Sequence, residues 1–359
     1  MKIGFLHKVN TTPPQRGGSV HTYQLSHYLA RQGHQLLALD NEQGSQFSDC
    51  FSRSLSGLRA LISQSDLLYL RIDGRVGWEV ASLVPGLVKP GQPIIWEVNS
   101  TLDELKVLPN PMRWRDRIGL FLRAFAARSA KAALCVSAPL VEYAQDIGIQ
   151  SAELVPNGSD PEMFTPALSD PTLFPGLENK FRVLWAGSTN YVWHDFDLVL
   201  NCARRLEETD ICFIVLGAPP RQLSGAIPTN LHFVPPVPYL EVPKYFASAH
   251  VGLSLYRTID WTKYGFFFSP LKLFDYAASG LPVVYTNLPE LDRVAAPFGR
   301  KVDVGDVQGL AHTLRDLQRD RSLYEWLSDQ ARRSVLDYYN WNRVGQQTEQ
   351  LIQTLIAAT

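Results

Sequence analysis

Cysteine is scarce in this sequence, and the other metal ligands show no pattern. The chain has 359 residues, of which four are cysteines, at positions 50, 135, 202 and 212. No pair of them has the spacing of a zinc site or a disulfide framework, and none of the eight histidines belongs to a His-Glu-x-x-His pattern. We therefore expect reduced, mostly buried cysteines and no structural metal.

Long hydrophobic runs are missing as well. No stretch approaches the roughly 18 to 20 apolar residues that crossing a bilayer requires. The apolar run at the start is too short for a signal peptide, and Lys8 and Asn10 interrupt it. We therefore expect a cytoplasmic protein that could meet a membrane only peripherally.

The chain also lacks a dominant charge. It carries 34 basic and 35 acidic residues, for a formal net charge of -1, so no global field recruits nucleic acid. Hydrophobic residues make up 45% and charged residues 19%, the balance of an ordinary globular protein. Its length is that of roughly two domains.

The first residues predict a doubly wound unit. KIGFLH is typical of a buried parallel strand, a loop ending in Gly17 and Gly18 follows, and then come a helix from about Ser19 to Arg31 and the strand QLLALD. The two glycines could serve only a tight turn, and the G-x-G-x-x-G fingerprint of dinucleotide-binding domains is absent. The sequence therefore disfavours a dehydrogenase.

Short apolar runs continue along the whole chain, separated by helical segments. They include DLLYLR, PIIWEV and AALCVS in the first half and FRVLWAG, ICFIVLG and VGLSLY in the second. Such runs favour parallel sheets covered on both faces. We predict an α/β protein of two facing Rossmann-like domains, residues 1–165 and 166–340, with a last helix in 341–359 returning to the first domain.

The stretch SPLKLFDYAASGLPVVYT, residues 269–286, has the signals of a complete helix followed by a strand. Ser269 can cap the helix, Pro270 suits its first position and Gly280 ends it. The leading amides and Lys272 could bind a diphosphate, and Asp275 could accept hydrogen bonds from a ribose. Alternatively, Lys272 and Asp275 form a surface pair three residues apart, and the pattern alone favours neither interpretation.

The same stretch resembles the donor-site signature of glycosyltransferase family 4, in its SP-x-K-x-x-E-Y-x-A-x-G-x-P-V variant. The segments GGSVHTYQLSHYLARQGHQ, LLYLR, IIWEVNSTLDEL and LVPNGSDPEMF extend the resemblance over nearly the whole chain. It implies the GT-B fold and retaining, hexosyltransferase-like transfer from a UDP- or GDP-type sugar to a glycan or lipid-linked acceptor. It implies a role in cell-surface polysaccharide or glycoconjugate synthesis. It does not imply a metal or another cofactor.

The sequence departs from that signature at two places. The second of the family's two glutamates is replaced by Asp275, and the position of the first is Phe267. The frequent Arg and Lys pair after the first strand of the second domain is not evident, and His194 is the nearest basic residue there. These departures leave open a weakened or lost activity.

Donor binding must therefore rest on other groups. We expect Lys263 and Lys272 to stabilise the charge that builds on the leaving diphosphate, and so to be catalytic. The further donor-binding candidates are Ser269, Pro270 and Leu271 with their amides, Asp275, Arg257, Gly17 and Gly18.

The acceptor side is less clearly marked. Glu97, Asn99 and Glu104 follow a predicted strand end, where wound domains place functional loops. Arg71 is similarly placed, but an arginine there is as often part of a structural salt bridge. The aromatic loop with Trp261, Tyr264, Phe266, Phe267 and Phe268 could contact a sugar or a base, or belong to the core.

Residues 113–131 have the pattern of a basic amphipathic helix. The apolar face contains Trp114, Ile118, Phe121, Leu122 and Phe125, and beside it run Arg113, Arg117, Arg128 and Lys131. We expect the apolar face to pack on the first sheet. Contact of the basic stripe with an anionic membrane is a further hypothesis.

Three functions are compatible with the sequence. The first is an active glycosyltransferase, and the second is an isomerase of the nucleotide-sugar 2-epimerase type. The third is a catalytically silent subunit that binds sugar nucleotides. The sequence lacks the clustered acidic and histidine groups that an epimerase requires for proton abstraction. The phenylalanine at position 267 favours the silent subunit.

Overall fold

The computed structural model describes residues 1–7, 14, 17–39, 46–73, 83–107, 114–220 and 225–358, with only the backbone of 115, 116, 119 and 120. The chain divides into two compact units. Unit 1 comprises Met1–Asn157, Asp260–Ser269 and Trp341–Thr359, and unit 2 comprises Gly158–Ile259 and Pro270–Asn340. The first crossing therefore lies earlier than the predicted boundary at 165. Residues 260–269, expected in the second domain, belong to the first.

Unit 1 is built on a seven-stranded parallel sheet in the order β3-β2-β1-β4-β5-β6-β7. Most of its strands are short apolar runs, and β4 and β5 are buried along their whole length. Their bounds are β1 Lys2–Leu6, β2 Gln35–Leu39, β3 Asp49–Phe51, β4 Leu67–Ile72, β5 Ile94–Val98, β6 Ala132–Cys135 and β7 Ala152–Leu154.

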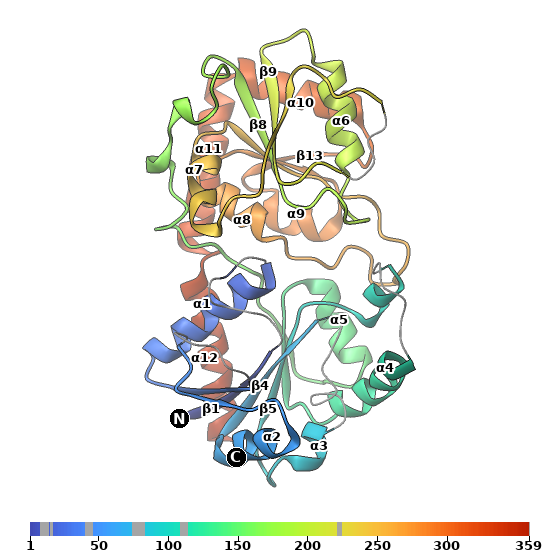
Figure 1. Cartoon of the computed structure of the whole chain (residues 1–359), viewed down its shortest axis with the longest axis vertical. Helices are drawn as coiled ribbons and strands as arrows, with labels where there is room; N and C mark the ends of the chain where they lie inside the picture. The colour runs from blue at the N-terminus through green and yellow to red at the C-terminus, as the bar shows by residue number, and fades with distance from the viewer. Residues whose placement is uncertain are drawn as a thin grey trace. The chain divides into compact units, whose positions relative to one another are not determined.

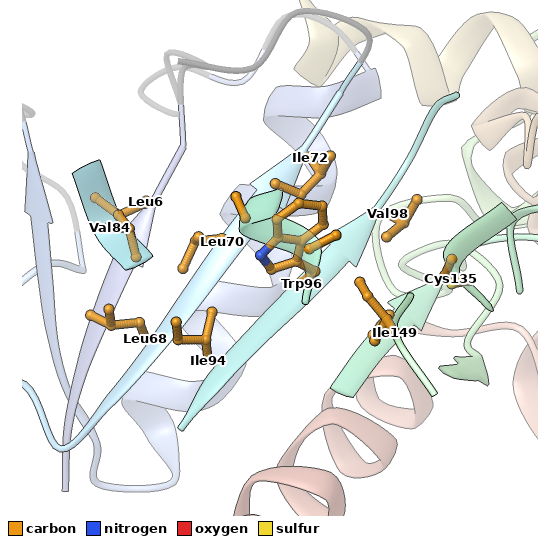
Figure 2. Packing of buried hydrophobic residues seen from close by; sticks show 14 of the residues in the cluster. Leu6, Leu68, Leu70, Ile72, Val84, Ile94, Trp96, Val98, Cys135 and Ile149 are labelled. Atoms are coloured by element: carbon orange, nitrogen blue, oxygen red, sulfur yellow. The ribbon is translucent and has the colours of Figure 1, made fainter. Parts of the chain in front are cut away.

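Helices cover this sheet. They are α1 Gly17–Arg31, α2 Leu55–Gln64, α3 Val84–Leu87, α4 Trp114–Ala127, α5 Ala138–Asp146 and α12 Trp341–Ala357, with a 3-10 turn η2 at Leu102–Lys106. Side chains of α2 to α5 join the strands in one hydrophobic core, in which the indole of Trp96 lies beside Ile72 (Figure 2). Helix α12 lies beside α1 (Figure 1), so close that a Cβ on Gly345 would lie 2.2 Å from the ring of Tyr28.

Unit 2 repeats this arrangement with a six-stranded parallel sheet in the order β10-β9-β8-β11-β12-β13. The strands are β8 Phe181–Ala186, β9 Ile211–Leu216, β10 Leu231–Val234, β11 Val251–Ser254, β12 Val283–Thr286 and β13 Gly299–Val302. The helices are α6 Phe196–Arg205, α7 Val242–Ala247, α8 Leu271–Ala278, α9 Pro289–Ala295, α10 Val307–Arg319 and α11 Arg321–Asp337. Short 3-10 turns lie at η3 Pro166–Leu168, η4 Pro171–Leu173 and η5 Tyr239–Glu241. Helix α6 lies beside α10, and α8 beside α11 (Figure 1).

Local signals account for several helix starts in unit 2. The carboxylates of Asp195, Asp306 and Asp320 accept hydrogen bonds from backbone amides three residues later, at 3.1, 2.9 and 2.9 Å. Such caps satisfy amides that have no partner inside the helix. They account for the positions at which α6, α10 and α11 begin.

The predicted fold class is confirmed: both units are Rossmann-like α/β domains with a doubly wound parallel sheet. None of the described helices combines the length and the apolar character needed to cross a membrane. The four cysteines form no disulfide with one another in the described ranges; Cys135, Cys202 and Cys212 are buried, whereas Cys50 is exposed.

Candidate functional site

The strand order of unit 2 reverses between β8 and β11, which are hydrogen-bonded neighbours. The connections on the two sides of such a point leave in opposite directions, so the loops at the carboxyl ends of the two strands diverge. Ligands of open α/β sheets bind in the crevice that results. Polar and aromatic groups from both strand ends, with Lys272 from α8, gather there.

Lys272 is the central residue of this cluster. Its ammonium nitrogen donates to the carbonyl oxygen of Ala186, the last residue of β8, at 3.2 Å. The same nitrogen lies 4.6 Å from the ring centre of Trp185 and 5.1 Å from that of Tyr256. Burial lowers the pKa of Lys272 to about 7. No carboxylate among the described residues forms an ion pair with it, so the cation is available for an anionic ligand.

His194 lies next to this lysine. A Cβ added to Gly187 would be 3.6 Å from the Cε1 atom of His194 and 3.7 Å from the Nζ atom of Lys272. The Nδ1 atom of His194 lies 2.6 Å from the Ser188 carbonyl oxygen, and because a carbonyl can only accept, Nδ1 carries the proton. Burial and the neighbouring Lys272 lower the pKa of His194 to about 3. At neutral pH the imidazole is therefore uncharged.

Helix α8 begins one residue later than its sequence signals suggest. It starts at Leu271, its N-cap position is Pro270, and no side chain caps it. Ser269, the predicted cap, instead accepts a hydrogen bond from the Asn157 amide through its hydroxyl at 3.1 Å. The first amide bonded within the helix is that of Leu273, to the Pro270 carbonyl at 3.1 Å. The amides of Leu271 and Lys272 precede it and are the ones available to an anion.

The polar face of α8 packs against its own unit. The Tyr276 hydroxyl accepts from the Ala186 amide at 2.8 Å, so Lys272 and Tyr276 both contact the end of β8. Asp275 is only 7% exposed and accepts from the Ser159 hydroxyl at 2.6 Å. Burial raises the pKa of Asp275 to about 8, so this carboxyl is mostly protonated at neutral pH. Lys272 and Asp275 are thus no surface pair.

The other predicted phosphate-binding cations are already paired. The guanidinium of Arg257 lies 2.5 Å from the Asp197 carboxylate, and that side chain is 48% exposed. Lys263 forms an ion pair with Asp146 at 2.5 Å and is 66% exposed. Because Lys263 belongs to unit 1 and Lys272 to unit 2, the structure does not gather the two proposed catalytic lysines in one unit.

In unit 1 the predicted acceptor-side residues form a buried cluster around Glu97, which is 1% exposed. One carboxylate oxygen contacts the Arg71 guanidinium and accepts from the Asn99 side-chain amide at 2.6 Å. The other accepts from the Tyr69 hydroxyl at 2.9 Å and lies 3.3 Å from the Nε2 atom of His21. Burial alone would raise the pKa of Glu97, but His21 and Arg71 hold it well below its usual range.

These contacts refine the acceptor-side predictions. The carboxylate of Glu97 is saturated by the chain's own donors, and Arg71 takes the structural role that the sequence left open, with Asp73 as a second partner at 3.3 Å. The side-chain amide of Asn99 is hydrogen-bonded to the Glu97 carboxylate. Glu104 accepts instead from the Ser100 hydroxyl, and burial raises its pKa.

Sequence reasoning missed His21 and Asn157. The Nδ1 atom of His21 lies 2.6 Å from the Asn157 side-chain oxygen, and the Asn157 side-chain amide donates to the Ser269 carbonyl at 2.6 Å. Both residues fall within segments that carry the family resemblance, but no local pattern assigns them a role. The nearby Gly17 and Gly18 open α1 instead of ending a loop, so the predicted glycine loop is wrong at these two positions.

The aromatic loop belongs to the interior of unit 1. Phe267 is fully buried in the hydrophobic core of unit 1, and Trp261, Tyr264 and Phe268 pack against that core. Their rings serve packing, so the interpretation as core residues is correct for this group. Phe267, which the family resemblance aligns with a glutamate, points into the interior instead of offering a polar group.

Helix α4 contradicts the expected packing of its apolar face. Four apolar side chains spaced along one face are exposed: Trp114 by 67%, Ile118 by 50%, Phe121 by 80% and Phe125 by 63%. The basic Arg117, Arg128 and Lys131 are exposed too, whereas Arg113 lies outside the described residues. The core-facing side is made instead by small residues, Ala126 and Ala127, and by Arg123, which is 1% exposed.

Comparison with known proteins points to one enzyme class. Residues 197–350 match the family model described as glycosyl transferase-like. That range contains Arg257, Lys272 and Asp275. A Bacillus subtilis (strain 168) protein named as a teichuronic acid biosynthesis glycosyltransferase, TuaH, is 27% identical over 168 residues. The match covers 44% of this chain and only 40% of that protein, so the chain spans about two fifths of the relative's length.

Solved structures resemble the chain over its whole length. Sucrose-phosphate synthase from Thermosynechococcus elongatus superposes with a TM-score of 0.75 at 16% identity, covering 100% of both chains. Anabaena HepE in complex with UDP and glucose gives 0.69 at 14% identity, covering 99% and 100%. WaaG, a glycosyltransferase involved in lipopolysaccharide biosynthesis, gives 0.65 at 14%, covering 98% and 99%. At these identities the likeness shows the fold, which is the two-domain GT-B type.

Metal chemistry has no evident ligand set in the described part of the chain. No group of three or more His, Cys, Asp and Glu side chains there could hold a metal ion.

Proposed function

We propose that the protein is a glycosyltransferase that binds a nucleotide diphosphate sugar in unit 2, with the pyrophosphate at Lys272 and the leading amides of α8. The observation that carries the proposal is the half-buried Lys272 at the carboxyl ends of β8 and β11, which has no carboxylate partner among the described residues. The match of residues 197–350 to a glycosyl transferase-like family supports it. So does a likeness to HepE, which has been solved with UDP-glucose.

The chemistry follows from these positions. In transfer, the bond between the sugar's anomeric carbon and the phosphate oxygen breaks, and a bond to the acceptor oxygen forms. The acceptor's proton passes to the departing phosphate oxygen, which allows retention of configuration without a protein nucleophile and without a metal. Negative charge builds on the diphosphate during this step, and Lys272 with the amides of Leu271 and Lys272 stabilises it.

The donor carries UDP or GDP in this proposal. Asp275 lies one turn beyond Lys272 on α8, where it can reach the ribose. Asp275 is mostly protonated at neutral pH, so its hydroxyl can also donate to a ribose oxygen. The acceptor is a glycan or a lipid-linked sugar, and the product belongs to a surface polysaccharide or glycoconjugate. A relative named for teichuronic acid biosynthesis supports this class.

In this proposal the enzyme acts at the cytoplasmic face of a membrane. The exposed apolar face of α4 can enter the lipid interface while Arg117, Arg128 and Lys131 meet anionic headgroups. Of residues 106–131 one is acidic, Asp116, and seven are basic: Lys106, Arg113, Arg115, Arg117, Arg123, Arg128 and Lys131. Such a concentration, in a chain of net charge -1, favours an anionic surface over a second copy of the same helix.

A silent sugar-nucleotide-binding subunit is the second candidate. The burial of Phe267 favours it, because no polar side chain stands at the family's first glutamate position. The epimerase has no comparable support, since the neighbourhood of Lys272 offers an uncharged His194 but no free carboxylate to pair with it as acid and base.

Thermal unfolding with UDP, GDP, dTDP and ADP tests the donor site. A nucleotide at about 100 times its dissociation constant adds about 2.7 kcal/mol to the free energy of unfolding. We expect a rise in melting temperature with UDP or GDP, and its loss in Lys272→Ala. Nucleotide release from UDP- and GDP-sugars with acceptor extracts then separates a transferase from a silent subunit. Equal melting temperatures with and without all four nucleotides would reject the donor site.

A further inference from the structure

Residues Asp260–Ser269, here called the strap, belong to unit 1 although unit 2 precedes and follows them in the sequence. The strap is fixed by its apolar side chains. Phe267 is fully buried in the hydrophobic core of unit 1, and its ring lies at centroid distances of 5.6 and 4.4 Å from those of Trp261 and Phe268. Removing it from unit 1 would open a cavity in that core.

Polar contacts hold the strap along its length. The Ser137 hydroxyl, at the start of α5, donates to the Phe267 carbonyl at 2.6 Å. The Tyr264 hydroxyl donates to Asp146 at 2.8 Å, and the Lys106 ammonium donates to the Trp261 carbonyl at 3.3 Å. The strap is therefore a docked part of unit 1 and not a free loop.

The last residue of the strap has the most specific anchor. Asn157 binds Ser269 twice, through its side-chain amide to the carbonyl at 2.6 Å and through its backbone amide to the hydroxyl at 3.1 Å. The Asn157 side-chain oxygen in turn contacts His21 at 2.6 Å, and His21 contacts Glu97. Asn157 is 8% exposed, so these bonds are formed away from bulk water and both side-chain groups are used.

Ser269 directly precedes Pro270, the N-cap residue of α8. Its carbonyl and its hydroxyl are both held, so the backbone is constrained up to the residue before Pro270. Pro270 itself has a fixed φ, which passes that constraint to Leu271 and Lys272. Through Ser269 and Pro270, Asn157 is thus connected along the chain to the amides of Leu271 and Lys272 that would bind the pyrophosphate.

We propose that Asn157 is a positioning residue for sugar-nucleotide binding, which holds Ser269 so that the first turn of α8 is preorganised for the diphosphate. This inference rests on the proposed function. Without the two hydrogen bonds between Asn157 and Ser269, the residues before Lys272 must become ordered when the ligand binds. The entropy cost of ordering the backbone lowers the affinity. We expect a loss of roughly tenfold for one residue's worth of backbone ordering.

The test compares two substitutions of the same kind. Asn157→Asp keeps an oxygen for His21 but replaces the amide donor by a group that repels the Ser269 carbonyl. Asn230→Asp is the matched control, because Asn230 is also 8% exposed and its side-chain amide donates to the Ile211 carbonyl at 3.2 Å, at the far end of β9. Calorimetric titration with UDP and GDP, melting temperature, and KM and kcat for the sugar nucleotide are measured for both.

We expect Asn157→Asp to raise the nucleotide's Kd and the donor's KM roughly tenfold, and Asn230→Asp to lower the melting temperature by a similar amount without changing Kd. Unchanged affinity in a folded Asn157→Asp variant would overturn the positioning role while leaving the proposed function standing. If the unsubstituted protein binds neither nucleotide, the proposed function fails, and the positioning role fails with it.

A second variant guards against misfolding of the first. Ser269→Ala removes only the hydroxyl that accepts from the Asn157 amide. Amide hydrogen exchange is followed in the absence of nucleotide at residues 273–275, in the first bonded turn of α8. Exchange at these residues that is faster than in the unsubstituted protein, with unchanged exchange in α11, supports the positioning role. Exchange rates equal to those of the unsubstituted protein in both helices contradict it.

Discussion

The ammonium nitrogen of Lys272 lies 3.2 Å from the carbonyl oxygen of Ala186, on top of the Trp185 ring. This contact supplies a dipole and a π face but no negative charge, while burial makes the charged form costly. The amine is therefore held close to the pH at which it gains its proton. A bound diphosphate would supply the missing negative charge.

Sugar-nucleotide binding should therefore be accompanied by proton uptake. Free Lys272 has a pKa of about 7, so at pH 8 it is mostly neutral, and the ligand raises its pKa above the solution pH. We expect uptake approaching one proton at pH 8 and little at pH 6, where the amine is already charged. Calorimetry with the best-binding sugar nucleotide in buffers of different ionisation enthalpy measures this directly. His194, with a pKa of about 3, contributes nothing in this range.

Lys272→Arg is the control for that experiment. An arginine stays charged at every pH used, so binding to this variant should take up no proton. Equal proton uptake by the two proteins would show that another group titrates.

Asp275 should make the protein less stable as pH rises. Its folded pKa of about 8 lies above the unfolded value of about 4, so the stability it contributes is fully present below pH 4 and is lost as pH rises through 8. Relative to Asp275→Asn, the free energy of unfolding should fall by at most about 1.4 kcal/mol per pH unit across this window. Denaturant unfolding at pH 5, 6.5 and 8 measures the difference, which also cancels the opposite slope from Lys272. Parallel pH profiles for the two proteins would contradict the buried, protonated carboxyl.

Removing only one partner of the Glu97–Arg71 ion pair should lower the free energy of unfolding strongly. Glu97→Ala leaves the buried Arg71 guanidinium without its main partner, and such a loss typically costs about 3 to 5 kcal/mol. In the double variant with Arg71→Met, the uncompensated charge is gone. We expect the double variant to be less destabilised than the sum of the two single variants, as measured by urea unfolding. Additive effects would show that the two groups act independently.

Helix α4 should bind anionic vesicles through its apolar face. Phe121→Ser with Phe125→Ser removes side chains that are 80% and 63% exposed, so it should abolish co-sedimentation with phosphatidylglycerol-containing vesicles without lowering the melting temperature. Arg117→Ala with Arg128→Ala should weaken binding by about 1 kcal/mol for each arginine, and more so at low salt. Trp326→Ser, at a residue of α11 that is 55% exposed, is the control and should bind normally. Sedimentation of the double Phe variant at the level of the unsubstituted protein would exclude the helix as the contact.

Much of the fold could be predicted from local patterns. The strands β8 and β9 and the last helix, α12, lie within a residue or two of their predicted positions, because buried parallel strands are short apolar runs. The strand β3 and the helix α2 were missed. Only the last residue of β3, Phe51, is even half-buried, so no apolar run marks that strand.

The candidate site was predictable only in part. Lys272 stands out because a helix start, a proline and a basic residue coincide in the sequence. The tie between His21 and Asn157 joins residues 136 positions apart, and only the folded chain brings them together. Phe267 shows the same limit, since an aromatic run signals burial but not which domain buries it. On α4 the amphipathic pattern was right, but the usual inference that its apolar side packs inward was wrong.

The strap also bears on how the protein can be divided. A fragment ending at Asn157 would lack Phe267 and α12, both of which complete the interior of unit 1. An excised piece running from Gly158 to Asn340 would carry the strap's aromatic side chains with nothing to cover them. Truncation at an apparent linker should thus give two insoluble products, and separate expression of either half will require the strap to be grafted back onto the first and replaced by a short polar loop in the second.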